Sequence, residues 1–392
     1  MQMIIKILFK RILFIYFFFL IFNPVSAQIH VRFIVKQHPS LHAMDTVYVA
    51  GSFNTWNPSD NRYQFKPVNS DSPFIDLQLA AGNYEYKLTR GSWNKVETSK
   101  NGKDAGNRSL ILAKDTAIKI FINGWKDDFK IEAVARQHTA SSHVSVLDSA
   151  FYIPQLNRTR RIWLYLPDDY SKTKKRFPVL YMHDGQNLFD EATSGFGEWG
   201  VDECLDSLFR QGKKECIVIG IDNGAKRMNE YNPYEFKPYG NGEGDKYVDF
   251  LVKTLKPYID KSLRTLPDKK NTFIAGSSMG GLISLYAVMK YPTVFGDAGI
   301  FSPAFWTASG LEKDVNKMTK KMRSKLFFYA GGKEGDRMIP DMKKIEADIK
   351  ALPAYRTGRS SAKIYERIDP DAKHNEAAWR KYFPEFYKWI LN

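Results

Sequence analysis

The sequence predicts two folded parts, an antiparallel β-sandwich followed by a mostly parallel β-sheet with helices on both faces. Short strands with alternating apolar and polar residues fill the first part, whereas continuous apolar strands alternate with helical segments in the second. A polar stretch separates the two. The chain of 392 residues is 43% hydrophobic, which is enough to bury a core in each part. Intrinsic disorder and a small disulfide-held scaffold are therefore excluded.

The chain begins with the pattern of a secretory signal. Lys6, Lys10 and Arg11 precede the apolar run Ile12–Phe22, and Val25-Ser26-Ala27 supplies the small residues that a signal peptidase recognises. The run is shorter than the roughly 20 apolar residues that span a bilayer, so a cleavable signal is favoured over a membrane anchor. We expect removal of residues 1–27 and a secreted or periplasmic protein without stable membrane insertion.

The net charge bears on the expected binding partners, and the cysteine content bears on the expected disulfides and metal sites. The formal net charge is +15, which favours anionic surfaces or substrates without specifying one. A secreted protein has little access to nucleic acid, so we expect no such partner. The two cysteines, Cys204 and Cys216, are too few for a disulfide framework or a Cys-rich zinc site, and a single bond between them is left open.

Residues 28–127 are predicted to form an all-β, immunoglobulin-like sandwich. Clusters of Gly, Asn, Asp and Pro separate its strands at a spacing of roughly ten residues, and no helix-period segment occurs. The expected strands are Ile29–Val35, Thr46–Ala50, Phe74–Leu79, Asn83–Leu88 and Thr116–Ile122. Residues 128–145 are expected to form a linker.

Residues 146–392 are predicted to form the second part, because continuous apolar strands between helices indicate a buried, mostly parallel sheet. The expected strands are Arg161–Leu166, Pro178–Met182, Cys216–Ile221, Thr272–Ala275, Lys325–Ala330 and Lys363–Ile368. The expected helices are Val201–Arg210, Lys246–Ser262, Met279–Lys290, Pro340–Leu352 and Ala377–Leu391.

The strongest catalytic signal is a serine between two glycines. Ser278 occupies the centre of Gly276-x-Ser278-x-Gly280, between an apolar strand and a helix-forming segment. This strand, tight turn and helix predict a nucleophile elbow, in which small flanking residues let the serine stand at the apex of the turn. A structural Gly-Ser turn is the alternative.

The general base follows from chain order. In this arrangement the histidine comes after the nucleophile and the acid, and His374 is the one histidine of seven that follows Ser278. The acid is expected in the loop after strand Lys325–Ala330, where Glu334 and Asp336 both qualify and Glu334 is favoured. Asp369 and Asp371 are weaker candidates.

An oxyanion hole is expected from the backbone N–H groups of Met279 and Gln186. Gln186 lies in the polar turn His183-Asp184-Gly185-Gln186, which follows an apolar strand. No string with metal-ligand spacing and no dinucleotide or phosphate-loop glycine pattern occurs, so we expect neither a metal nor a cofactor.

With these motifs, the second part resembles the esterase D branch of the α/β-hydrolases, which includes carbohydrate esterase family 1 and enterochelin-type esterases. The likeness runs from about residue 146 to the end and is carried by Leu180–Phe189, Gly276–Gly281, Phe301–Trp306, Gly331–Glu334 and His374. It implies an α/β-hydrolase fold and serine ester hydrolysis. It also implies substrate contacts from Asp184, Arg227, Tyr231 and Trp306.

The first part resembles glycogen- and starch-binding sandwich modules. The likeness is carried by Val47–Asn57, Tyr84–Lys87 and Gly91–Trp93. It implies a sugar platform formed by Trp56, Lys87 and Trp93, since flat aromatic faces suit sugar rings. A purely structural role for these tryptophans is the alternative.

Together these features predict a secreted serine ester hydrolase that cleaves carbohydrate-linked esters of the feruloyl or acetyl type and that binds polysaccharide through its first part. The alternatives are a siderophore trilactone esterase of the enterobactin type, an acyltransferase on the same site, and a catalytically inert glycan-binding protein.

Overall fold

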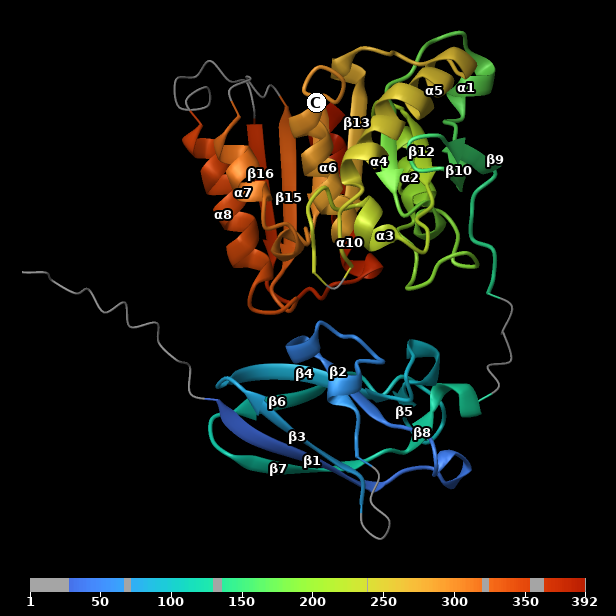
Figure 1. Ribbon diagram of the computed structural model, residues 1–392. Coiled ribbons are helices and arrows are strands. Elements are labelled where there is room, and N and C mark those ends of the chain that lie inside the picture. The colour runs from blue at the N-terminus through green and yellow to red at the C-terminus, as the bar shows by residue number, and fades with distance from the viewer. Residues whose placement is uncertain are drawn as a thin grey trace, which may run out of the picture. The chain divides into compact units, whose positions relative to one another are not determined.

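The computed structural model describes residues 28–66, 72–129, 136–237, 239–318, 324–352 and 363–391. The predicted signal, residues 1–27, lies outside the described residues. The chain divides into two compact units, one up to Glu132 and one from Ala133 onward (Figure 1). No helix in the described ranges is both long enough and apolar enough to cross a bilayer.

The N-terminal unit contains two three-stranded sheets with the strand orders β3-β1-β7 and β2-β4-β6, and a short pair β5-β8. The strands are β1 (Ile29–Gln37), β2 (Tyr48–Gly51), β3 (Phe74–Leu79), β4 (Gly82–Thr89), β5 (Glu97–Thr98), β6 (Arg108–Leu112), β7 (Thr116–Phe121) and β8 (Gly124–Trp125). Phe33, Leu88 and Ile120 are fully buried in one core shared by both sheets, so the unit is a β-sandwich.

The sandwich differs from the sequence prediction in its strands and in one pairing. Strand β6 and the short strands β5 and β8 were not expected. The pair β1–β7 is parallel rather than antiparallel, with Phe33 opposite Ile118. Strands far apart in the sequence can pair in parallel because the intervening chain is long enough to cross over.

The C-terminal unit is built on one eight-stranded sheet with the order β16-β15-β14-β13-β11-β12-β10-β9. The strands are β9 (Val144–Ile153), β10 (Arg158–Tyr165), β11 (Val179–His183), β12 (Ile217–Ile221), β13 (Thr272–Ser277), β14 (Asp297–Phe301), β15 (Lys325–Gly331) and β16 (Lys363–Asp369). From β12 to β16 all pairs are parallel, whereas β10 is antiparallel to both β9 and β12. Strand β14, which contains a central glycine, was not predicted, and neither was β9, which begins at Val144 inside the segment assigned to the linker.

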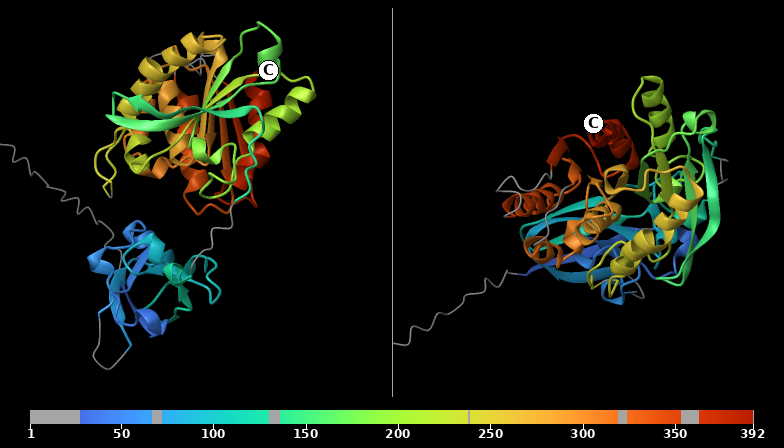
Figure 2. Two further views of the ribbon diagram at one scale, coloured as in Figure 1. Left: turned by 90° about the vertical axis from the view of Figure 1, so that its right-hand side faces the viewer. Right: turned by 90° about the horizontal axis from the view of Figure 1, so that it is seen from above.

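Helices cover both faces of this sheet, as predicted (Figure 2, left). Helices α4, α5, α6 and α8 contribute to the core on one face, and α2 and α10 to the core on the other. The helices are α1 (Asp169–Lys172), α2 (Val201–Arg210), α3 (Arg227–Glu230), α4 (Gly244–Phe250), α5 (Lys256–Ser262), α6 (Met279–Lys290), α7 (Leu311–Asn316), α8 (Met338–Ala351) and α10 (Glu376–Leu391). A π-helical turn, η7 (Leu251–Leu255), joins α4 to α5.

Strands β11, β12 and β13 are buried along their whole length. This confirms the prediction, made from their continuous apolar runs, of a mostly parallel sheet that is covered on both faces. The architecture is that of an α/β hydrolase, as expected. Because β11, β13, β14, β15 and β16 are parallel, the loops that follow them gather at one edge of the sheet. All the residues proposed for catalysis lie in these loops or directly beside them.

Candidate active site

Ser278 stands in a tight turn between β13 and α6. Its backbone has φ 58° and ψ −117°, a conformation that non-glycine residues rarely adopt outside functional sites. The turn is held from β14, because the Ser278 N–H donates to the carbonyl of Phe301 at 2.9 Å and Ala304 N–H donates to the Ser278 carbonyl at 3.0 Å. Ser278 is partly exposed between buried neighbours. This is the geometry of a nucleophile elbow.

The glycine at position 276 is required by close approach. A Cβ atom there would lie 3.0 Å from the backbone of Gly280 and 3.0 Å from Cδ2 of His183, so a side chain would push the turn open. His183 itself is buried beneath the elbow, with Nδ1 2.9 Å from the hydroxyl of Tyr247. Burial lowers the pKa of His183 to about 3, so this imidazole is neutral at physiological pH and supports the elbow.

His374 and Glu334 lie in contact. Nδ1 of His374 is 2.9 Å from Oε2 of Glu334, in the turns that follow β16 and β15 respectively. The Glu334 side chain is fully buried, whereas that of His374 is 35% exposed. Asp336, the alternative acid, is exposed, and the hydrogen bond to the imidazole comes from Glu334.

The weaker acid candidates are engaged elsewhere. Asp369 pairs with Lys381 and accepts a hydrogen bond from Tyr382, and Asp371 pairs with Lys333.

The two expected oxyanion donors lie at the starts of helical turns, Met279 in the first position and Gln186 in the second. Met279 is the first residue of α6, and Gln186 lies in the short turn η6 (Gly185–Asn187) after β11. The first N–H groups of a helical turn have no acceptor within that turn, so they can point at a developing anion. The side chain of Gln186 is fixed, because its Oε1 accepts from the N–H of Asn223 at 3.1 Å.

Two of the expected substrate contacts instead bind each other. Asp184 and Arg227 form a two-bond ion pair, with Nε to Oδ1 at 2.7 Å and Nη2 to Oδ2 at 2.8 Å, and Asn223 adds a hydrogen bond at 2.6 Å. Burial alone would raise the pKa of Asp184, but the charge and hydrogen bonds of Arg227 and the hydrogen bond from Asn223 together outweigh it and hold that pKa below its usual value. The pair joins the turn after β11 to α3.

The other two expected substrate contacts differ in exposure. Tyr231 is fully buried, with its ring 5.1 Å from that of His183 and 4.9 Å from that of Tyr247. It therefore packs beneath the site and has no surface for a substrate contact, which corrects the expectation. Trp306, in the turn η9 (Phe305–Thr307), is 39% exposed and can contact a ligand.

Sequence reasoning missed two buried polar residues at this site, Ser302 and Glu376. Ser302, directly after β14, donates to Oε1 of Glu334 at 2.8 Å and accepts from the indole N–H of Trp379 at 2.9 Å. Glu376 is 6% exposed and accepts from Nδ2 of Asn187 at 3.1 Å. Ser302 directly follows a strand of the sheet, and Glu376 begins α10 two positions after His374. These positions are the sequence signals that could have indicated a role at the site.

The segment 136–143, assigned to the linker by sequence, is bound to the C-terminal unit. Oγ1 of Thr139 donates to Glu198 at 2.7 Å and accepts from the N–H of Glu191 at 2.8 Å. Nδ1 of His138 lies 2.7 Å from Asp190, a residue close behind η6. This segment therefore braces the loop between η6 and α2.

In the N-terminal unit, Trp56 and Trp93 lie side by side. Their ring centroids are 6.3 Å apart with the planes inclined by 43°, and Trp93 is 39% exposed. Lys87, the third expected platform residue, is paired with Asp104 and its side chain is 11% exposed. Lys87 is thus less accessible than the resemblance implied.

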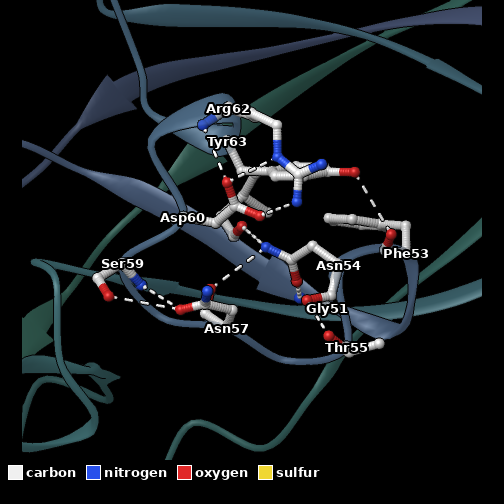
Figure 3. Close-up of polar contacts among 10 residues, drawn as sticks. Gly51, Phe53, Asn54, Thr55, Asn57, Ser59, Asp60, Arg62 and Tyr63 are labelled. Carbon is white, nitrogen blue, oxygen red and sulfur yellow. Dashed lines mark hydrogen bonds and ion pairs between the residues drawn. The ribbon is translucent and has the colours of Figure 1, made fainter. Parts of the chain in front are cut away.

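The loop that presents Trp56 is rigidly held (Figure 3). Asn54 is buried and bonds three backbone groups: its Oδ1 accepts from the N–H of Gly51 at 2.8 Å, and its Nδ2 donates to the carbonyls of Val49 and Asn57 at 3.1 and 3.2 Å. Thr55 and Trp56 both have positive φ, 55° and 60°. Two consecutive strained residues persist only where their surroundings determine them, as at ligand sites.

One group of side chains among the described residues comes close enough to hold a metal ion. It comprises His42, Asp127 and Asp128 in the N-terminal unit. Arg90 already pairs with Asp127, and Nε2 of His42 lies 2.6 Å from Asp128, so these groups satisfy one another. Cys204 and Cys216 are both free.

Comparison with known proteins identifies relatives for both parts. The family model described as "Putative esterase" matches residues 153–390. The uncharacterised protein YbbA of Bacillus subtilis is 27% identical over 246 residues, which are 59% of this chain and 92% of that protein. The endo-1,4-beta-xylanase/feruloyl esterase of Xylanibacter ruminicola is 27% identical over 244 residues, 61% of this chain and 30% of that protein.

The N-terminal part matches a different kind of protein. An alpha-amylase of Niallia circulans is 40% identical over 99 residues, which are 25% of this chain and 8% of that enzyme. This chain therefore spans only a small share of the two named enzymes. The match agrees with the expected resemblance to starch-binding modules.

A solved structure shows the same fold. The enterobactin esterase FES from Shigella flexneri, solved in the presence of enterobactin, has a TM-score of 0.52 and 16% identity, with 92% of each chain covered. The family model extends over more than half of this chain, from the end of β9 into α10. This protein is therefore a member of the "Putative esterase" family of the α/β-hydrolase fold.

Proposed function

We propose that this protein is a secreted serine ester hydrolase that cleaves carbohydrate-linked esters of the feruloyl or acetyl type. The observation that carries the proposal is the hydrogen bond between His374 and the buried Glu334, at the same sheet edge as Ser278 on its strained turn. A buried carboxylate on Nδ1 leaves Nε2 as the imidazole atom that can take a proton.

The proposed reaction has two stages, formation of an acyl-serine and its hydrolysis. His374 Nε2 takes the hydroxyl proton of Ser278 while Oγ attacks the ester carbonyl, and the N–H groups of Met279 and Gln186 hold the resulting oxyanion. When the intermediate collapses, the alcohol leaves with that proton and an acyl-serine remains. Water then attacks through the same base, which releases the acid and restores Ser278. Glu334 stays ionised throughout and stabilises the imidazolium.

Two observations support a carbohydrate-linked substrate. The esterase part is similar to an enzyme that is described as both a xylanase and a feruloyl esterase, and the N-terminal part is similar to a stretch of an amylase. The paired Trp56 and Trp93, on a loop held by Asn54, offer an aromatic surface for sugar rings. We propose that this surface binds polysaccharide and brings the esterase to its substrate.

Secretion rests on the sequence alone. The basic, apolar and small-residue segments before Gln28 support a cleavable signal. N-terminal sequencing of the protein from the culture medium or periplasm is expected to begin at Gln28, and an N-terminus that retains the apolar run would contradict cleavage.

The test is an ester panel with the purified protein and its Ser278→Ala variant. The panel contains a feruloylated arabino-oligosaccharide, an acetylated xylo-oligosaccharide, an enterobactin-type trilactone and p-nitrophenyl acetate. We expect the two sugar esters to give the highest kcat/KM. Loss of the nucleophile should lower kcat by about a thousandfold or more on every substrate while the unfolding temperature stays the same.

The results separate the candidate functions. A trilactone that ranks first would favour the siderophore esterase, for which the positive net charge is the supporting observation because it suits an anionic substrate. Undiminished turnover in Ser278→Ala would remove Ser278 from the mechanism, and no turnover by the unmodified protein on any ester would favour an inert glycan-binding protein.

A further inference from the structure

Both oxygens of the Glu334 carboxylate are hydrogen-bonded to neighbours. Oε2 faces His374, and Oε1 accepts from the hydroxyl of Ser302 at 2.8 Å and from the N–H of Gly331 at 2.7 Å. Gly331 permits this approach, because a Cβ at that position would lie 2.6 Å from Oε1. The side chain of Glu334 is fully buried, so these three groups set its orientation.

Trp379 fixes the direction of the hydrogen bond from Ser302. The indole N–H can only donate, so Ser302 Oγ is the acceptor in their contact at 2.9 Å. A hydroxyl has one hydrogen to give, and the other partner of Oγ in the structure is Glu334 Oε1. The hydrogen bonds therefore run one way, from Trp379 through Ser302 to Glu334, and Oε1 can only be an acceptor.

Ser302 is placed for this contact at a structural cost. It is fully buried, and its φ of 42° lies in the region that non-glycine residues avoid. Its N–H donates to the carbonyl of Tyr329 on β15 at 2.7 Å. A polar, strained residue in a buried position persists where its neighbours over-determine it, and such positions cluster at functional sites.

Trp379 also contacts the histidine. The indole and imidazole rings meet edge to face, with centroids 5.1 Å apart and planes at 87°. Trp379 is the fourth residue of α10, and its ring centroid lies 5.7 Å from that of Trp199. One side chain thus holds the imidazole directly and the carboxylate through Ser302.

We propose that Ser302 and Trp379 are positioning residues that hold the Glu334 carboxylate in the orientation in which it orders His374. This inference rests on the proposed function and adds two residues that act on the orientation of Glu334 and His374 and not on the substrate. Donors on Oε1 leave Oε2 as the oxygen that faces the imidazole, so His374 carries its proton on Nδ1 and presents a free Nε2 to Ser278.

The test compares Ser302→Ala and Trp379→Phe with the unmodified protein on p-nitrophenyl acetate. We expect kcat to fall about 10- to 100-fold in Ser302→Ala, the factor that one hydrogen bond to a charged group supplies. A smaller fall is expected in Trp379→Phe, which keeps an aromatic ring beside His374. KM should stay within about threefold in both, because neither residue binds the substrate.

Two matched variants separate positioning from general damage. Thr272→Val removes another buried hydroxyl, one that donates to the carbonyl of Asp268 at 3.1 Å at the opposite end of β13. Trp389→Phe changes another tryptophan of α10. Both controls are expected to keep kcat within about twofold, even where they lower the unfolding temperature.

A double-mutant cycle gives the decisive readout. If Ser302 acts through Glu334, Ser302→Ala should cost less than about twofold in a Glu334→Ala background. A full additional loss in that background, or an unchanged kcat in both single variants, overturns the proposal. If Ser302→Ala does not fold, the same cycle with Trp379→Phe carries the test.

A failure of the proposed function and a failure of the positioning role give different results. If Ser278→Ala keeps its activity, the proposed function fails. If Ser278→Ala is inactive while Ser302→Ala and Trp379→Phe turn over normally, only the positioning role is wrong.

Discussion

At the scale of single residues, Glu376 shows how burial sets the chemistry of a side chain. It lies two positions after His374, is 6% exposed and accepts one hydrogen bond from Asn187. Burial raises its pKa from 4.5 to about 7, the negative charge of Asp184 acts in the same direction, and the hydrogen bond and His374 act against it. Its carboxyl group is therefore largely protonated in the folded protein at mildly acidic pH.

This raised pKa predicts a pH-dependent loss of stability. Between about pH 4.5 and 7 the unfolded chain has released the Glu376 proton while the folded protein keeps it, so stability falls as the pH rises through this window. The shift corresponds to at most on the order of 3 kcal/mol. Glu376→Gln cannot ionise, so relative to the unmodified protein it should gain about 1–3 kcal/mol between pH 5 and pH 8.

Urea unfolding at the two pH values measures this difference. Glu235→Gln, at an exposed position, is the control and should show no such gain. Equal pH dependence of the unmodified protein and Glu376→Gln would contradict the raised pKa.

At the scale of elements, the loop between η6 and α2 depends on residues that precede the sheet. Three buried carboxylates, Asp190, Glu198 and Asp202, accept hydrogen bonds from the segment 136–143, through Thr139, Thr139 and Ser141 respectively. Arg380 of α10 reaches Glu198 from the other side at 2.7 Å. A stretch without apolar periodicity is therefore ordered by polar contacts, and it closes the loop behind the expected oxyanion turn.

Removal of one of these contacts should loosen the loop. Thr139→Val keeps the shape of the side chain but leaves Glu198 and the N–H of Glu191 each without one partner. We expect the free energy of unfolding to fall by about 1–3 kcal/mol, since the buried, charged Glu198 loses a hydrogen bond. Chemical unfolding measures it, with Ser309→Ala, at an exposed position, expected to change stability by less than about 0.5 kcal/mol. Equal stability of Thr139→Val and Ser309→Ala would show that the segment does not brace the loop.

At the scale of the whole molecule, two units with separate cores share one chain. This division predicts that binding and catalysis can be lost independently. Replacement of Trp56 and Trp93 by Ala together should abolish retention on insoluble starch or xylan while hydrolysis of p-nitrophenyl acetate stays within about twofold. A pull-down assay and the small-ester assay on the same samples measure both.

The control for this experiment is Ile111→Ala, which removes another exposed apolar residue of the N-terminal unit. It should leave retention unchanged. Retention that persists in the tryptophan variant would exclude Trp56 and Trp93 as the anchor.

Much of the fold followed from local patterns. The continuous apolar runs of β11, β12 and β13 predicted a buried parallel sheet, and alternation predicted β3 and β4. Strands β6 and β14 escaped because a short run, or one interrupted by glycine, carries little periodicity. The parallel pairing of β1 with β7 was not predicted, because the sequence of a strand does not indicate which other strand it pairs with.

By itself the sequence determined the positions where chemistry can occur: a serine between small residues after a buried strand, one histidine downstream of it, and two acids after another strand. Such features are local, since they depend on strand periodicity, turn geometry and chain order. Only the tertiary structure decided that Glu334 rather than Asp336 meets His374, that Tyr231 is buried, and that Ser302 and Trp379 bond in series. These outcomes depend on the packing of segments far apart in the chain, where a buried polar atom must find whichever partner the fold brings to it.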